Sequence, residues 1–186
     1  MADLALTPAT RTLPLSGAHG GSSVARLEPA AAAARLSLRA RPEDAEALST
    51  ALGIALPVKP KTSASANGRT ALWLGPDEWL VIDEGQGGLL QAAKDCAAPH
   101  SATDVSHRNT AILVSGPGAQ QTINSGCPLD LSLTAFPVGA CARTLLGKVE
   151  IVLLRTEQDA FRVEVWRSFS GYAFGLLAEG ARDAAL

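Results

Sequence analysis

A short apolar run that stops abruptly at glycine and proline constrains the fold more than any other part of this chain. Residues 110–114 (TAILV) are rich in branched side chains, and Ser-Gly-Pro-Gly follows from Ser115 onward. This pattern is typical of a buried strand that runs into a turn. Pro117 suits the first turn of a helix, and residues 120–124 are helix-compatible up to Gly126. We therefore predict a strand followed directly by a helix, with the Ser115 hydroxyl capping the first free N–H groups.

The residues before this strand predict a strand, a helix, a hairpin, a second helix and a returning strand. The helix signal is clearest at 42–53, which begins with proline and two acids and ends with glycine. Residues 70–74 and 79–83 predict two strands joined by Gly-Pro-Asp-Glu, with proline where a type I turn favours it. The other expected elements are a strand from about Ala34, a long connection over 56–69, a helix over 88–98 and a strand from Ser101.

The residues after Gly126 predict three strands and a final helix. The strands are expected at 142–146, 149–154 and 161–166, and the helix at 168–179. The first part of the chain then has the element order of a split βαβ unit, and the second part partly repeats that order. We predict an α+β fold of two related split-βαβ (ferredoxin-like) halves, about 31–106 and 107–186, around antiparallel or mixed sheets that share one core.

Residues 1–30 are predicted to form an irregular arm, because Thr, Pro, Ser and Gly dominate there. An arm of this composition folds weakly alone and orders against a partner, so it is a mild hint of assembly.

The overall composition argues against binding to nucleic acid or to a membrane. The chain has 16 basic and 18 acidic residues among 186 and only 4% aromatic residues, without a local Lys/Arg cluster. It therefore lacks the positive field and the stacking surface that nucleic acid requires. No apolar run approaches a secretory signal or a membrane span, so we expect a cytoplasmic protein.

The cysteines and histidines do not predict a metal or redox site. The cysteines are odd in number and lack the short paired spacing of such sites, and the histidines never pair with them at ligand spacing. We expect reduced thiols, with Cys127 and Cys141 buried and inert.

Residues 104–107 (DVSH) place an acid, a hydroxyl and an imidazole close together, but a hydrolytic site is not expected. In a strand, Asp104 and Ser106 would share one face while His107 points to the other. No Gly-x-Ser-x-Gly turn presents Ser106 as a nucleophile. Structural hydrogen bonding is the favoured role. The Ser-Gly-Pro-Gly turn likewise lacks the lysine and the spacing of a phosphate-binding loop.

Two tryptophans at the predicted hairpin, Trp73 and Trp79, are candidates for contact with another chain. Strand alternation is expected to leave at least one indole facing outward, where it could fill a partner's pocket. Core packing is the alternative for both residues.

Four basic residues are further contact candidates. His107 and Arg108 are expected to cap the strand entrance or to contact a neighbouring chain. Arg143 and Arg167 lie at the ends of predicted strands. Each could cap a strand within the chain or pair with a carboxylate of a partner, and the sequence favours neither role.

Several of these motifs resemble known families. DVSH, a strand and then SGPGA resemble the folate-binding aminomethyltransferase superfamily, which includes the glycine-cleavage T-protein. A closer resemblance, from about Leu36 to the C-terminus, is to the gamma subunits of heterotetrameric sarcosine oxidases. It is carried by LWLGPDEWL at 72–80, GCPLDL at 126–131, RTLLGKV at 143–149 and RSFSGY at 167–172.

The resemblance implies a non-catalytic, structural chain without a cofactor of its own. The enzymes it resembles oxidatively demethylate sarcosine with O₂ and tetrahydrofolate, giving glycine, H₂O₂ and 5,10-methylenetetrahydrofolate. It implies alpha, beta and delta subunits as partners, with FAD, FMN, NAD and zinc held on those subunits. In agreement, the chain has no Gly-x-Gly-x-x-Gly after a strand. The alternative is a free-standing folate-binding or one-carbon-transfer protein of the T-protein superfamily.

Overall fold

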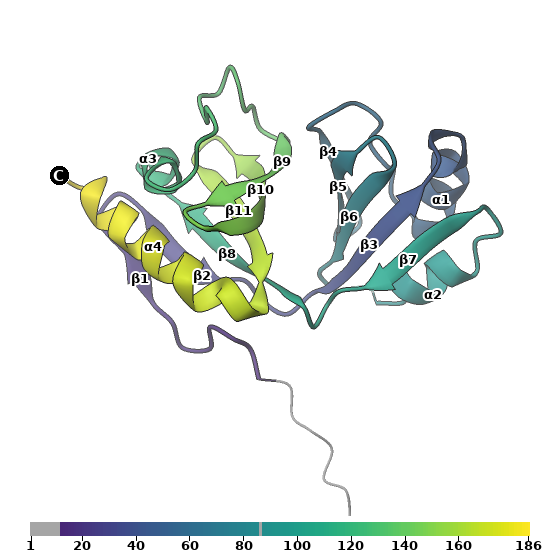
Figure 1. Ribbon diagram of the computed structural model, residues 1–186, viewed down its shortest axis with the longest axis horizontal. Helices are drawn as coiled ribbons and strands as arrows, with labels where there is room; N and C mark the ends of the chain where they lie inside the picture. The colour runs from purple at the N-terminus through teal and green to yellow at the C-terminus, as the bar shows by residue number, and fades with distance from the viewer. Residues whose placement is uncertain (1–11, 86) are drawn as a thin grey trace, which may run out of the picture.

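Two antiparallel sheets lie beside each other, and a pair of helices covers the outer side of each (Figure 1). The structure is a computed structural model that describes residues 12–85 and 87–186. Every strand pair in these residues is antiparallel. The predicted α+β class is confirmed.

The first sheet has the order β4-β5-β6-β3-β7 and is covered by α1 and α2. Its strands are β3 (Ala34–Ala40), β4 (Ser63–Ala66), β5 (Arg69–Gly75), β6 (Glu78–Asp83) and β7 (His100–Asp104). The helices are η1 (Pro42–Asp44), α1 (Ala45–Leu52) and α2 (Leu89–Lys94). The predicted helix over 42–53 is confirmed, because Gly53 ends it in the left-handed conformation (φ 62°) and donates to Ser49 O and Thr50 O.

The predicted long connection over 56–69 is wrong in its second part, which contains β4. Strand β4 pairs with β5 around a two-residue turn, Asn67-Gly68. Both turn residues have positive φ, 52° and 74°. This conformation suits a tight hairpin because its twist matches that of the flanking strands.

The second sheet has the order β1-β2-β8-β11-β10-β9 and is covered by α3 and α4. Its strands are β1 (Gly20–Gly21), β2 (Arg26–Pro29), β8 (Asn109–Ser115), β9 (Cys141–Leu146), β10 (Val149–Glu157) and β11 (Ala160–Trp166). The helices are α3 (Ala119–Asn124), η2 (Arg167–Phe169) and α4 (Ser170–Asp183).

The two sheets repeat one topology, with one strand supplied from the N-terminal arm. The neighbouring strands β5-β6-β3-β7 have the ferredoxin-like arrangement, and β10-β11-β8-β2 has the same arrangement. In the first sheet the fourth strand, β7, follows α2 along the chain. In the second sheet β2, which comes before β8 along the chain, takes that place.

The expectation of an irregular arm is therefore wrong for residues 20–29. Leu27 pairs with Val114 and is 2% exposed, so the alternation of apolar and polar residues in β2 places its apolar side in the core. The first eleven residues of the predicted arm lie outside the described residues.

The predicted cap at Ser115 is also wrong, because the chain needs that residue in the sheet. Ser115 pairs with Ala160 on one side and Arg26 on the other, and α3 begins after Gly118 without a side-chain cap. The turn packs on the arm: a Cβ at Gly116 (φ 116°) would lie 2.5 Å from Val24 O. A glycine is required there for this close approach.

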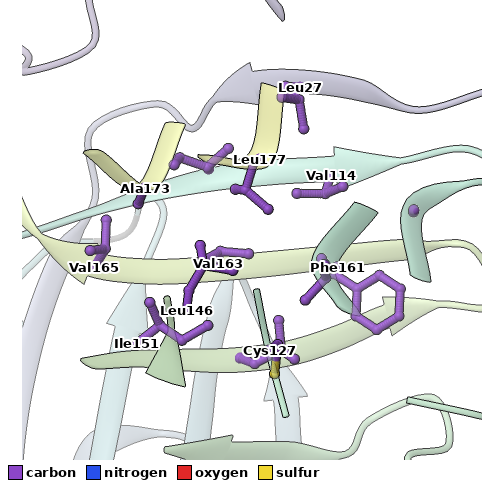
Figure 2. Close-up of a cluster of buried hydrophobic side chains, with 14 of the residues drawn as sticks. Leu27, Val114, Cys127, Leu146, Ile151, Phe161, Val163, Val165, Ala173 and Leu177 are labelled. Atoms are coloured by element: carbon purple, nitrogen blue, oxygen red, sulfur yellow. The ribbon is translucent and has the colours of Figure 1, made fainter. Parts of the chain in front are cut away.

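Three apolar clusters hold the layers together. One lies between the second sheet and α3/α4, and Figure 2 shows Val163 and Val165 of β11 beside Ala173 and Leu177 of α4. A second lies between the first sheet and α1/α2. The third lies between the sheets and contains Leu72, Leu80, Ile82, Cys141, Val152 and Leu154 among others. The third cluster joins the two sheets, but the buried apolar side chains form three separate clusters and not the one continuous core that the sequence predicted.

A buried cluster of charged groups also joins the two sheets. The Glu164 carboxylate of β11 accepts from Arg35 Nε of β3 at 2.6 Å and from Arg162 Nε at 2.8 Å. Arg35 and Glu164 are each 2% exposed. Arg162 also donates to the exposed Glu84 carboxylate at 2.5 Å. Burial alone would lower the pKa of Arg162, but Glu164 and Glu84 raise it above its usual value.

Glu164→Gln is expected to lower the free energy of unfolding by about 3–5 kcal/mol, because it leaves Arg35 and Arg162 buried beside a neutral amide. The measurement is denaturant unfolding of the purified chain. Glu28→Gln is the control, because the Glu28–Arg26 pair is exposed and is worth less than about 1 kcal/mol. Equal losses for the two variants would contradict the structural role of the buried cluster.

Candidate functional site

An exposed cluster of aromatic and arginine side chains lies where β11 passes into η2 and α4. Trp166 and Phe169 are 41% and 42% exposed, and their rings stack with centroids 6.0 Å apart. The Arg108 guanidinium lies over the Trp166 ring, 5.2 Å from its centroid. Tyr172, 45% exposed, follows Phe169 by three positions and so lies on the same side of the helix. We call Arg108, Trp166, Arg167, Phe169 and Tyr172 the aromatic–arginine patch.

The backbone holds this patch together. Arg167 N donates to Arg108 O at 2.7 Å, which fixes the end of β11 against the turn before β8. The Tyr172 hydroxyl accepts from Lys148 N at 3.3 Å. Beside the patch lies an open hollow of about 460 Å³ lined by Pro14, Arg108, Trp166, Arg167, Ser168 and Ser170. The lining residues include two arginines and no acidic residue, so the hollow is positively charged.

The structure brings together contact candidates from two distant parts of the sequence. Arg108 and Arg167 both line the hollow, and His107 is exposed in the turn directly before Arg108. The sequence analysis did not predict that Phe169 and Tyr172 are exposed. The available signal was the spacing of three aromatic residues at every third position from Trp166 onward.

The two hairpin tryptophans do not point to opposite faces of the sheet, although alternation along the strands suggested that at least one would face outward. Trp73 and Trp79 are direct cross-strand partners, so both side chains point to the same face of the sheet. Trp79 is 1% exposed and donates from Nε1 to Pro57 O at 2.8 Å. The prediction of Trp79 as a contact residue is therefore wrong, because core packing and this hydrogen bond occupy its side chain. Trp73 is half-buried against the same core and stays a prediction as a contact.

Arg143 pairs with a carboxylate of its own chain. Its guanidinium donates to both oxygens of Glu78 in the opposite sheet, at 2.5 and 3.2 Å, and Arg39 donates to Glu78 at 3.1 Å. The hydrogen bond from Arg143 is the main reason that the pKa of Glu78 lies below its usual value, and Arg108 contributes through its charge. The stabilisation from this depressed pKa is present at neutral pH and is lost as the pH falls through the pKa of folded Glu78.

A small polar cavity lies between the two sheets beside this pair. Its volume is about 40 Å³, and its lining includes Ser37, Glu78, Asn109, Arg143 and Glu164. Pockets that bind small molecules typically have roughly 300–1,000 Å³. The cavity has room for little more than one water molecule, whose share of liquid volume is about 30 Å³.

Asp104 and Ser106 have structural roles, as expected. Ser106 Oγ accepts from Arg35 N at 2.8 Å, and Asp104 Oδ1 accepts from Ser106 N at 2.8 Å. The assumed strand alternation is wrong, because β7 ends at Asp104 and residues 106–108 form a turn. The Ser106 hydroxyl therefore ties that turn to the backbone of β3.

The cysteines differ in their surroundings. Cys127 and Cys141 are buried, as predicted, whereas Cys96 is partly exposed. Burial raises the pKa of the Cys141 thiol to about 11, and a hydrogen bond with the Trp73 backbone offsets part of this rise. Among the described residues, no group of three His, Cys, Asp or Glu side chains is placed to hold a metal ion. Nor does any helix within 12–85 or 87–186 have the length and hydrophobicity to cross a membrane.

Comparison with known proteins decides the family. The model of the sarcosine oxidase gamma subunit family matches residues 37–183, close to the range over which the sequence motifs resemble it. The chain belongs to the sarcosine oxidase gamma subunit family. The matched range includes the hairpin, Glu164 and all five residues of the aromatic–arginine patch, whereas Arg35, the buried partner of Glu164, lies before it. The arm strand β2 lies before it.

Curated relatives and solved structures agree with this family. Sarcosine oxidase subunit gamma of Arthrobacter sp. is 36% identical over 153 residues, which cover 79% of this chain and 74% of that one. Its counterpart from Corynebacterium sp. (strain U-96) is 30% identical over 168 residues, covering 88% and 82%. In the structure of heterotetrameric sarcosine oxidase from Corynebacterium sp. U-96 with pyrrole 2-carboxylate, a chain matches with a TM-score of 0.87 and 26% identity, covering 95% of this chain and 97% of that one.

A second solved structure is similar in fold alone. Aminomethyltransferase T of the glycine cleavage system from Bartonella henselae has a TM-score of 0.64 at 13% identity, covering 86% of this chain and 49% of that one. The predicted likeness to the aminomethyltransferase fold is confirmed.

Trp79→Ala is expected to lower the free energy of unfolding of this gamma-subunit chain by about 3–5 kcal/mol, because it empties a buried site and removes a buried hydrogen bond. Trp73→Ala, at the opposed and half-buried position, is the matched comparison and should cost less. Thermal and denaturant unfolding of the isolated chains measure both losses. A larger loss for Trp73→Ala would contradict the packing described for the hairpin.

In the native chain at pH 8, only Cys96 is expected to react rapidly with an aromatic disulfide reagent. The thiolate is the reactive form, and Cys141, with a pKa of about 11, stays protonated and buried. Counting released thiolate before and after adding denaturant measures this. Cys96→Ser should abolish the native reaction, whereas Cys141→Ala should leave it unchanged. Rapid reaction that survives Cys96→Ser would contradict the expectation.

Proposed function

We propose that this chain is the structural, non-catalytic gamma subunit of a heterotetrameric sarcosine oxidase. The observation that carries the proposal is the match to a chain of the Corynebacterium heterotetramer, which covers both chains nearly end to end. A match of this extent covers the described fold as a whole and not one part of it. The family assignment over residues 37–183 supports the same conclusion.

The assembled enzyme would oxidatively demethylate sarcosine with O₂ and tetrahydrofolate, as the family resemblance implies. The partners would be the alpha, beta and delta subunits, which would hold FAD, FMN, NAD and zinc. We further propose a cytoplasmic location for this complex.

Several polar groups that are buried or that line the cavity between the sheets form hydrogen bonds within the chain, which supports a structural role. Glu164 is bonded to two arginines, Glu78 to two others, and Ser106 to the backbone of β3. These groups stabilise the packing of the sheets. His107, Arg108 and Arg167 are exposed on the surface. We propose them as residues that contact partner subunits. Arg143 and Trp73 already make contacts within the chain. We therefore propose that only the exposed parts of their side chains contact a partner.

The rival function, free-standing folate binding or one-carbon transfer, requires a pocket for a pterin ring. The cavity between the sheets has about 40 Å³, well below the roughly 300–1,000 Å³ of pockets that bind small molecules, and the larger hollow of about 460 Å³ is open to solvent beside the aromatic–arginine patch and does not enclose a ligand. The subunit role is therefore the better supported of the two.

The test is co-expression of the gamma chain with the alpha, beta and delta chains, carrying an affinity tag on a different subunit. We expect the gamma chain to co-purify at a fixed ratio, and the yield of assembled sarcosine oxidase to fall when it is omitted. The isolated chain should gain thermal stability when partners are added, because binding to the folded state stabilises it by mass action. A chain that is monodisperse, binds a reduced folate and never co-purifies would refute the proposal in favour of the rival.

A further inference from the structure

We propose that the aromatic–arginine patch is the surface that docks onto a partner subunit, and that the partner presents carboxylates around an apolar pocket. This inference rests on the proposed function, because it assumes that partner subunits exist. It adds which surface makes the contact and which chemistry recognises it.

The concentration of exposed aromatic side chains in the patch indicates association. The chain contains 3 Trp, 1 Tyr and 4 Phe residues, and Trp166, Phe169 and Tyr172 are each at least 41% exposed on this one surface. Placing three of so few aromatic residues in water at one site leaves a large apolar area unburied. Trp, Tyr and Arg are also the residues in which binding energy concentrates at protein interfaces.

The patch is ordered before any partner binds. The Trp166 ring contacts both the Arg108 guanidinium, 5.2 Å from its centroid, and the Phe169 ring, with the two ring centroids 6.0 Å apart. The bond from Arg167 N to Arg108 O and the bond from Lys148 N to the Tyr172 hydroxyl fix the supporting backbone. Side chains that are already fixed lose little conformational entropy on binding, so more of the contact energy appears as affinity.

The charge of the patch specifies the partner. Arg108 and Arg167 line the hollow without an acidic residue among its lining, although the whole chain carries a net charge of −2. A complementary surface therefore presents carboxylates to the two guanidinium groups. A second copy of this chain docked patch to patch would place arginines against arginines, which is unfavourable. The occupant is therefore a different, acidic subunit surface with an apolar pocket for the indole.

The experiment compares patch variants with controls in the four-subunit complex. The patch variants are Arg167→Glu, Arg108→Glu and Trp166→Ala, and the conservative variant is Trp166→Phe. The controls are Arg41→Glu and Val58→Ala, at residues that are exposed elsewhere on the surface, with 78% and 71% exposure. The affinity of each purified gamma chain for the gamma-less complex is measured by titration at low and high salt.

We expect each patch variant to bind at least about 30-fold more weakly than the wild type, the range of an interface hot spot. The controls should bind like the wild type, and Trp166→Phe should recover part of the loss. Raising the salt concentration should weaken wild-type binding more than binding of Arg167→Glu, because screening removes an attraction that the variant no longer has. Wild-type affinity in Arg167→Glu and Trp166→Ala would overturn the inference.

Folding of each variant is checked first by thermal unfolding. If Trp166→Ala or Arg108→Glu does not fold, Arg167→Glu decides the question, because Arg167 is exposed and contributes only its backbone to the contacts described here. Failure of the wild-type chain to co-purify would refute the proposed function. Co-purification of the wild type together with undiminished binding of the patch variants would refute the docking surface alone. Self-association of the wild type that the patch variants abolish would also overturn it.

Discussion

The buried ion pair between Arg35 and Glu164 is the constraint on which the arrangement of the two sheets depends. A buried charge is strongly unfavourable unless a partner and further hydrogen bonds compensate it. Glu164 lies on β11 and Arg35 on β3, so the sheets must meet with these strands within reach of one another. Arg35 N also binds Ser106 Oγ, which fixes the turn that connects the two sheets. The apolar side chains between the sheets supply the packing energy, whereas the ion pair selects the arrangement.

This arrangement separates the polar groups into an inner and an outer set. The inner set, including Glu164 and Glu78, is bonded within the chain and stabilises the sheets. The outer set is the aromatic–arginine patch, where β11, η2 and the turn before β8 meet. A subunit of a hetero-oligomer needs both properties, a rigid body and an ordered surface that still exposes apolar area. The family assignment and the structure thus describe one role.

Elements with local signals were predictable from the sequence, and those that depend on distant strands were not. The helix over 42–53 carries its own start and stop residues, and the Gly-Pro-Asp-Glu turn specifies its hairpin. Asn67-Gly68 is an equally local hairpin signal and could have revealed β4. Strand β2 has no such signal. It is ordered by pairing with β8, and the place beside β8 appears only when the whole topology is known.

The sequence by itself determined the α+β class, most of the regular elements and, through four short motifs, the family. Each of these depends on residues close together in the chain, where propensity, capping and periodicity act. Only the tertiary structure decided which face each side chain occupies. Trp79 is buried and Trp166 exposed, although both lie at strand ends, because α1 and α2 cover the face of β6 that carries Trp79 whereas Trp166 lies where β11 leaves the sheet. The tertiary structure also places Arg108 beside Arg167, because the pairing of β8 with β11 joins segments that no local sequence pattern connects.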